Sequence, residues 1–224
     1  MASKVYRNPS ISFDSSTSLT ILVGQGSSQK GFLAHESVIC AHSEFFRRAM
    51  KGNWAERKER LVKLPDDKPA TFALYMNIVY TNVVAHAPLL SSQNPPDRTA
   101  EYIELCELYV LSEKLCDKRA KNSVLETMRD LKISEYYSSN SAKPTSFGPS
   151  AAAIAIMYAG TPAGSIGRKL MTDMWSTVPP EHIIDNACKL PGEFIKDLAV
   201  TLLRDQTSRK NKALSAKANA YNEP

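Results

Sequence analysis

Alternation of apolar and polar positions predicts a β-hairpin near the amino terminus. Leu19, Ile21 and Val23 recur at every second position, which is the period of a strand with one buried face. Residues 24–28, GQGSS, are turn-forming, and extended character resumes at residues 31–34. The sequence therefore predicts two strands joined by a glycine-containing turn.

Helical spacing replaces this alternation after the hairpin. Residues 35–41 suit two helical turns, and Ser43 stands where it would cap a second helix that ends at Gly52. A third strand is predicted at residues 60–64, and Pro69 favours the start of the next helix. The apolar positions of the second and third helices are Phe45, Phe46, Ala49 and Met50, and then Phe72, Tyr75, Met76, Val79 and Tyr80.

Two amphipathic helices are predicted after a loop at residues 82–98. The first has acidic residues on a wet face and apolar residues on a dry one, and the second repeats apolar residues every three or four positions. The wet face carries Glu101, Glu104 and Glu107. The dry faces carry Tyr102, Ile103, Cys106, Tyr109 and Val110, and then Ala120, Val124, Met128 and Leu131. Both helices are expected to face a core.

A Ser- and Pro-rich stretch at residues 138–150 predicts a linker. It divides the chain into a domain at 1–137, a helical extension at 151–207 and a basic flexible tail at 208–224. Residues 151–159 are apolar on all sides and predict a buried helix. Two further apolar faces are expected in the extension: Ile166, Leu170, Met174 and Val178, and then Phe194, Ile195, Leu198, Ala199, Leu202 and Leu203.

The composition is that of a folded chain with one generous domain or two small ones. At 224 residues and 43% hydrophobic content the chain can fill a sizeable core. Its longest run without polar side chains, residues 151–159, is far shorter than the roughly 20 residues of a membrane span, and residues 1–12 lack the apolar segment of a signal peptide. The four cysteines form no CxxC pair, so we expect a reducing compartment and a cytoplasmic or nuclear protein.

The net charge of +5 is concentrated at the carboxyl end. Residues 204–224 carry +3 of it, which leaves +2 for the rest of the chain. A nucleic-acid interface on a folded face needs a stripe of Lys and Arg with aromatic neighbours, and the body of the chain has none. Nucleic-acid binding is therefore not expected.

Motifs for catalysis or cofactor binding are weak throughout the sequence. Gly24 and Gly26 precede a strand rather than a helix, so they favour a hairpin turn over a phosphate loop. His35, Cys40 and His42 are close in sequence but lack a fourth ligand, and buried structural residues are the preferred interpretation. No GxSxG nucleophile motif occurs. The sequence predicts no enzyme, no cofactor and no metal.

Residues 32–46, FLAHESVICAHSEFF, resemble the BTB/POZ signature, in which an Ala-His pair, a Val-Leu-type step and a Ser-x-x-Phe close follow one another. LVKLPDD at 61–67 and IVYT at 78–81 look like the strand and helix that follow in this family, and LYVLSEKL at 108–115 is similar to the next helix. The resemblance covers residues 18 to about 135.

From residue 157 onward the chain is similar to the helical extension of many fungal BTB proteins. The resemblance implies an α+β BTB/POZ fold, with a small β-sheet capped by α-helical hairpins and followed by additional helices. It also implies protein–protein association without catalysis.

One interpretation of the resemblance is a substrate adaptor of a cullin-RING ubiquitin ligase. Family members engage cullins beside an apolar-x-Glu motif after the second helix, which Trp54-Ala55-Glu56 fits. The expected cullin contacts are residues around this motif: Phe46, Met50, Trp54 and Glu56. Phe46 could instead be a core residue. Trp54 could instead pack on its own helix. Because the chain has no kelch, MATH or zinc-finger pattern, the helices after residue 150 would receive the substrate protein.

The alternative interpretation is a self-associating scaffold, or a transcription or chromatin regulator, that binds no cullin. In both cases we expect a homodimer through Ile11, Phe13 and Leu19, which are apolar at strand-like spacing near an exposed edge. Family dimers often use an Asp and a basic residue where this chain has Ser18 and Glu36, and this argues against a repressor-style groove. The expected partners are a second copy, a cullin, or an unknown substrate or regulator protein, and no membrane.

Overall fold

The structure is a computed structural model that describes residues 18–52, 54–85, 98–138 and 148–216. It forms two compact units, and the chain passes between them more than once. The first unit comprises Met1–Ala87 and Leu111–Glu126, and the second comprises Pro88–Val110 and Thr127–Pro224. Two helices, α5 (Thr99–Lys114) and α6 (Lys118–Ser138), therefore contribute residues to both units.

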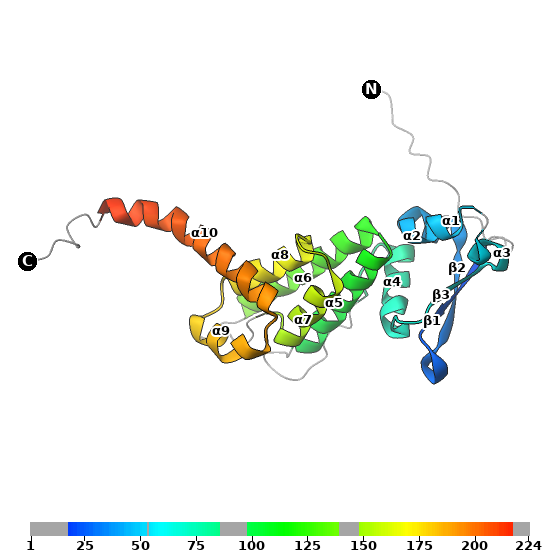
Figure 1. The fold of residues 1–224 in the computed structure, drawn as a ribbon, viewed down its shortest axis with the longest axis horizontal. Coiled ribbons are helices and arrows are strands. Elements are labelled where there is room, and N and C mark those ends of the chain that lie inside the picture. Colours follow the sequence, from blue (N-terminus) through cyan, green and yellow to red (C-terminus); the bar gives the residue numbers. More distant parts are fainter. Residues whose placement is uncertain (1–17, 53, 86–97, 139–147, 217–224) are drawn as a thin grey trace, which may run out of the picture. The chain divides into compact units, whose positions relative to one another are not determined.

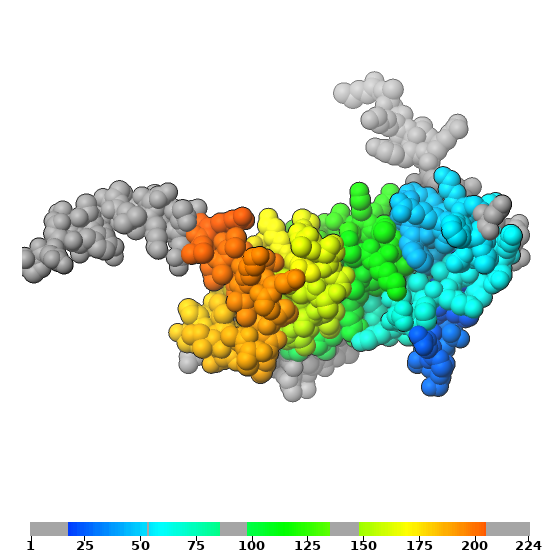
Figure 2. Space-filling view, in the orientation of Figure 1, coloured from blue at the N-terminus to red at the C-terminus, as the bar shows by residue number. Residues whose placement is uncertain are grey.

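The first unit is built on a three-stranded mixed sheet. Strands β1 (Ser18–Val23) and β2 (Lys30–His35) pair antiparallel, as the hairpin pattern predicts, and β3 (Leu61–Leu64) pairs parallel to β1. The order β2-β1-β3 makes β1 the central strand. A short 3-10 turn (η2, Gly26–Ser28) joins β1 and β2 and projects from the rest of the unit (Figures 1 and 2). Positive φ angles at Gly24 (84°) and Gly26 (57°) explain the glycines of this turn.

One face of the sheet packs against helices and forms the core of the first unit. These helices include α1 (Glu36–His42), α2 (Glu44–Ala49) and α4 (Pro69–Thr81). Leu19, Ile21 and Val23 on β1 are 0% exposed. Aromatic rings from three elements continue this core, because Phe72 on α4 lies 5.0 Å from the ring of Phe32 and 6.5 Å from that of Phe46. The predicted dimer contact Leu19 is thus a core residue of the central strand and does not lie at an edge.

Helix α4 begins at Pro69, as predicted, and ends at Thr81, after which Asn82 adopts a left-handed conformation. Phe72, Tyr75 and Val79 are buried, but Tyr80 is 41% exposed, so the expected apolar face is only partly buried. The hydroxyl of Tyr80 accepts a hydrogen bond from the backbone N–H of His35 at 2.9 Å and lies 2.9 Å from its Nδ1. The polar end of Tyr80 therefore ties α4 to the end of β2.

The second unit contains helices from the latter part of the chain. They are α7 (Ala151–Gly160), α8 (Ile166–Trp175), α9 (Pro180–Asn186) and α10 (Gly192–Ala216), with a short 3-10 turn, η3 (Ala187–Lys189), before α10. Helix α8 packs against both α7 and α10. The helix α10 continues past residue 207, where the helical extension was expected to end.

The buried face of α8 agrees only in part with the predicted one, because Met174 on the helix and Val178 beyond it are buried as expected. Ile166 is 61% exposed, whereas Gly167, Arg168, Met171 and Trp175 are buried. A Cβ at Gly167 would lie 2.6 Å from the sulfur of Met157 and 2.7 Å from the ring of Tyr109. Because Met157 and Tyr109 approach α8 so closely at Gly167, this side of the helix is buried. An apolar spacing of four residues does not reveal such a contact.

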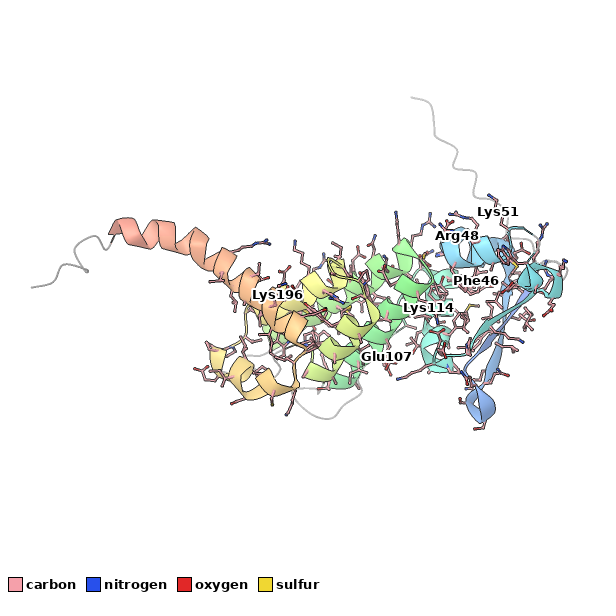
Figure 3. All side chains as sticks on the ribbon, in the orientation of Figure 1. Phe46, Arg48, Lys51, Glu107, Lys114 and Lys196 are labelled. Atoms are coloured by element: carbon pink, nitrogen blue, oxygen red, sulfur yellow. The ribbon has the colours of Figure 1, made fainter. Side chains whose placement is uncertain are left out.

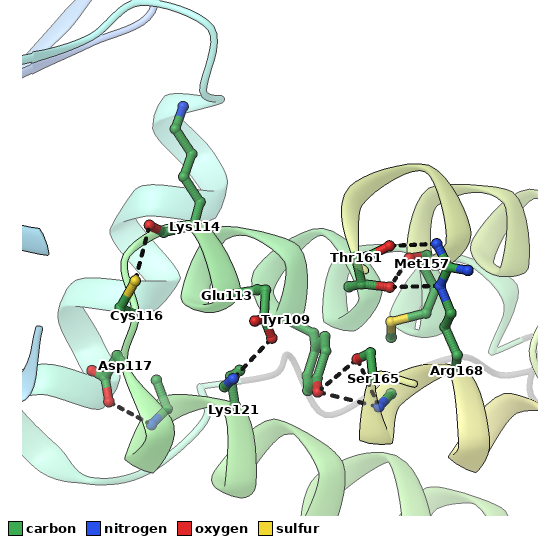
Figure 4. A network of polar contacts seen from close by, with 12 residues as sticks. Tyr109, Glu113, Lys114, Cys116, Asp117, Lys121, Met157, Thr161, Ser165 and Arg168 are labelled. Atoms are coloured by element: carbon green, nitrogen blue, oxygen red, sulfur yellow. Dashed lines mark hydrogen bonds and ion pairs between the residues drawn. The ribbon is translucent and has the colours of Figure 1, made fainter. Parts of the chain in front are cut away.

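Arg168 is a buried cation that joins the helices of the second unit. Its guanidinium donates hydrogen bonds to the carbonyl oxygens of Tyr158 (2.7 Å) and Thr161, to Oγ1 of Thr161 (3.2 Å) and to Glu193 (2.6 Å). Figure 4 shows the two bonds to Thr161. The same guanidinium lies 4.5 Å from the ring centroid of Tyr158. A charged residue is thus buried at a position of α8 that the apolar periodicity does not assign to the core.

The apolar stripes of α7 and α10 are only partly buried. Ala152 and Ala159 on α7 are exposed, so this helix is not buried on all sides. On α10, Phe194 and Leu198 are buried, but Leu203 is 62% exposed. Among the residues that the structure describes, no helix is long and apolar enough to cross a membrane.

Candidate functional site

A groove of about 630 Å³ lies in the first unit between α2, α3 (Ala55–Glu59) and β3. Its volume is in the range of ordinary ligand sites. The lining mixes aromatic, aliphatic and charged side chains: Glu44, Phe45, Arg48, Ala49, Trp54, Ala55, Glu56, Glu59, Leu61, Val62, Lys63 and Cys116. All of these residues belong to the first unit.

Ser43 fixes the wall of the groove that α2 forms. Its hydroxyl oxygen accepts a hydrogen bond from the backbone N–H of Phe46 at 3.2 Å, and its O–H donates to the carbonyl of Leu115 at 2.6 Å. The predicted cap is confirmed, and Ser43 itself is 0% exposed. The N–H of Phe45 also donates to the carbonyl of Leu115, at 3.3 Å. These bonds orient α2 so that Phe46 enters the core while Phe45 lines the groove.

Trp54 stands at the start of α3 with 64% of its side chain exposed. The chain reaches it through Gly52, whose φ of 107° is accessible to few other residues. Nη1 of Arg57 donates a hydrogen bond to the carbonyl of Gly52 at 3.0 Å, which holds this turn. A large apolar ring is therefore displayed beside the groove from a fixed backbone.

Two carboxylates follow Trp54 on α3. Glu56 is half-buried and Glu59 is exposed, and neither makes an ion pair with any described residue. Glu44 differs, because it pairs with both Arg47 and Arg48 of its own helix. The carboxylates of Glu56 and Glu59 on α3 are thus available to a partner. The carboxylate of Glu44 on α2 is already neutralised by the two arginines of its own helix.

Arg60 connects α3 to the sheet. It ends α3 in a left-handed conformation, and its Nε donates to the carbonyl of Ser18 at 2.7 Å. Its Nη2 pairs with Glu36 at 2.7 Å. Glu36 therefore has an ion-pair partner within the first unit.

The structure brings together some of the predicted contact residues and separates others. Trp54 and Glu56 both line the groove. Phe46 is 0% and Met50 7% exposed, so these side chains offer a partner no surface and belong to the core. Figure 3 shows Phe46 on the inner side of α2, with Arg48 and Lys51 on its outer side. The interpretation of Phe46 as a core residue agrees with this burial.

Several groove residues carry no signal in the sequence. Phe45 and Ala49 were expected in a core, and Leu61 in a strand. Cys116 also lines the groove. It lies in the connection between α5 and α6, more than fifty positions after Leu61 in the sequence. The proposed dimer residues Ile11 and Phe13 lie outside the described residues.

Two of the residues considered for metal binding, Cys40 and His42, lie on α1. The hydroxyl of Tyr75 donates to Asp117 at 3.1 Å, and Nδ1 of His42 lies 3.5 Å from the same carboxylate. Burial raises the pKa of Cys40 to about 11 and that of Cys106 to about 12, so both thiols are protonated at neutral pH. Within the described ranges no three His, Cys, Asp or Glu side chains are grouped to hold a metal ion.

A comparison with protein-family models identifies the family of the first part of the chain. The family model of the BTB/POZ domain matches residues 11–122, which is half of the chain. The chain belongs to the BTB/POZ domain family. BTB/POZ domains are protein–protein interaction modules and are generally not enzymes. The predicted α+β fold with further helices after the domain is confirmed, and the groove lies within the matched BTB/POZ range. A search of curated proteins found no match.

Proposed function

We propose that this BTB/POZ protein self-associates and serves as a substrate adaptor of a cullin-RING ubiquitin ligase, with the cullin seated on the groove between α2, α3 and β3. The observation that carries the proposal is the exposure of Trp54 in a motif of an apolar residue, any residue and Glu. An exposed aromatic ring beside an apolar groove is typical of interaction surfaces.

The charges around the groove support a protein partner. Glu56 and Glu59 have no ion-pair partner among the described residues and lie three positions apart on α3. A partner with complementary basic groups would associate faster and in a defined register. The exposed part of α10, which carries Leu203, supports a separate contact for the substrate protein.

Self-association is supported by an apolar residue on the outer face of the sheet. Leu33 is 70% exposed on β2, which is an edge strand. Light scattering at about 100 µM protein tests this part of the proposal, because stable dimer interfaces usually bury on the order of 2,000 Å². A dimer mass supports it, and a strictly monomeric mass contradicts it.

Titration calorimetry of the full chain with a purified cullin amino-terminal domain tests the adaptor role. We expect measurable heat with a dissociation constant below about 50 µM, equivalent to about 6 kcal/mol. If no cullin binds at that concentration, the adaptor role is abandoned and a scaffold or regulator without cullin binding is the remaining proposal.

A further inference from the structure

Strand β3 has one edge that no described residue pairs. In the described part of the chain it pairs only with β1. At the two ends of this pairing the N–H of Thr20 donates to the carbonyl of Arg60 and that of Gly24 to the carbonyl of Leu64, at 3.0 Å each. Backbone groups of alternate residues in a strand point to opposite sides. The N–H and C=O groups of Leu61 and Lys63 therefore point away from β1, and no described residue hydrogen-bonds them.

The groove follows this free edge. Leu61, Val62 and Lys63 all line it although they are consecutive, whereas one face of a strand would contribute only alternate residues. Val62 is 2% exposed, so the groove reaches the strand's backbone rather than its outer face alone. Phe45 and Trp54 supply apolar surface in the same groove.

The charges of the groove favour a basic segment. Its lining carries three carboxylates and two basic groups. One carboxylate and one basic group, Glu44 and Arg48, pair with each other at 3.0 Å. Glu56 and Glu59 stay unpaired among the described residues and line the same groove as the exposed Trp54. A Lys or Arg side chain is attracted both to carboxylates and to the face of an indole ring.

We propose that an extended segment of a partner protein adds to the free edge of β3 as a fourth strand, with a Lys or Arg of the segment seated among Trp54, Glu56 and Glu59. This deepens the proposed function, because it rests on the use of the groove by a protein partner, but that partner need not be a cullin. A lysine on a short edge strand is also a common means of blocking such pairing. The apolar groove beside Lys63 distinguishes a binding edge from a merely protected one.

A random heptapeptide display library, selected on the full-length protein, is the probe. We expect enriched peptides to combine a Lys or Arg with β-branched residues at alternate positions. Lys63→Pro removes the outward N–H at a strand position where proline is tolerated, and Lys63→Ala is its matched control with the N–H retained. We expect an enriched peptide to bind Lys63→Ala at least as tightly as wild type, because a like charge is removed, and Lys63→Pro about tenfold more weakly than Lys63→Ala.

Backbone N-methylation of the enriched peptide gives a second measurement that needs no protein variant. If the peptide pairs as a strand, N-methylation should weaken its binding at every second residue and have little effect at the residues between. This pattern can be measured on the wild-type protein even if Lys63→Pro does not fold. The proposal is overturned if selection enriches nothing over a bare surface, if the enriched peptides are acidic, or if N-methylation shows no period of two. The cullin titration is independent of these outcomes, so failure of the strand proposal and failure of the adaptor role are distinguishable.

Discussion

Replacement of Trp54 by Ala removes the most exposed ring of the groove. A Trp side chain presents roughly 250 Å², so its 64% exposure leaves about 160 Å² for a partner to cover. At about 25 cal/mol per Å² complete coverage contributes about 4 kcal/mol, and coverage of half that area about 2 kcal/mol. We therefore expect Trp54→Ala to weaken cullin binding about thirtyfold. Because little of the ring packs on its own unit, the melting temperature should fall by no more than about 3 °C.

Titration calorimetry and thermal unfolding of the same samples measure both quantities. Val83→Ala is the matched control, because Val83 is 62% exposed but does not line the groove. We expect this control to leave affinity unchanged. The reasoning is refuted if Trp54→Ala binds a cullin within twofold of wild type, or if it lowers stability by several kcal/mol while affinity stays the same.

Three further substitutions and one thiol-labelling experiment have defined outcomes. Glu56→Ala should weaken cullin binding less than Trp54→Ala does, since a charge at the rim is screened by salt, and a larger loss in calorimetry would contradict this. Ser43→Ala removes a helix cap and leaves the buried carbonyl of Leu115 with only the longer bond from the N–H of Phe45, so thermal unfolding should show a loss of about 2 kcal/mol. Arg168→Met leaves two buried carbonyls unpaired in the second unit and should cost about 3 kcal/mol, which denaturant unfolding measures. At pH 8 the raised pKa values of Cys40 and Cys106 leave about one part in a thousand or less as thiolate, so both should react with a thiol reagent far more slowly than the exposed Cys188.

The first unit is largely predictable because its signals are local. The hairpin follows from period-two alternation, and the helix start at Ser43 from a hydroxyl that caps its own next turn. Exposure of Trp54 agrees with its place after Gly52, whose φ of 107° is not helical, although α2 already ends at Ala49 rather than at Gly52. In each case the physical cause lies within a few residues of the effect.

Features that depend on distant contacts were not predictable. The face of α8 is set by the approach of Gly167 to the ring of Tyr109, which is 58 positions away. The groove exists because Cys116 and β3 meet α2 in space. Burial of Arg168 depends on carbonyls at the end of α7. None of these contacts leaves a periodic pattern in the sequence.

Hydrogen exchange of the full chain, with and without a purified cullin amino-terminal domain, tests most directly whether the groove is the binding site. The account predicts slower amide exchange in α2, α3 and β3 when the cullin is present, with little change in α8 and α10. Slower exchange confined to other elements, with α2, α3 and β3 unchanged, would contradict it.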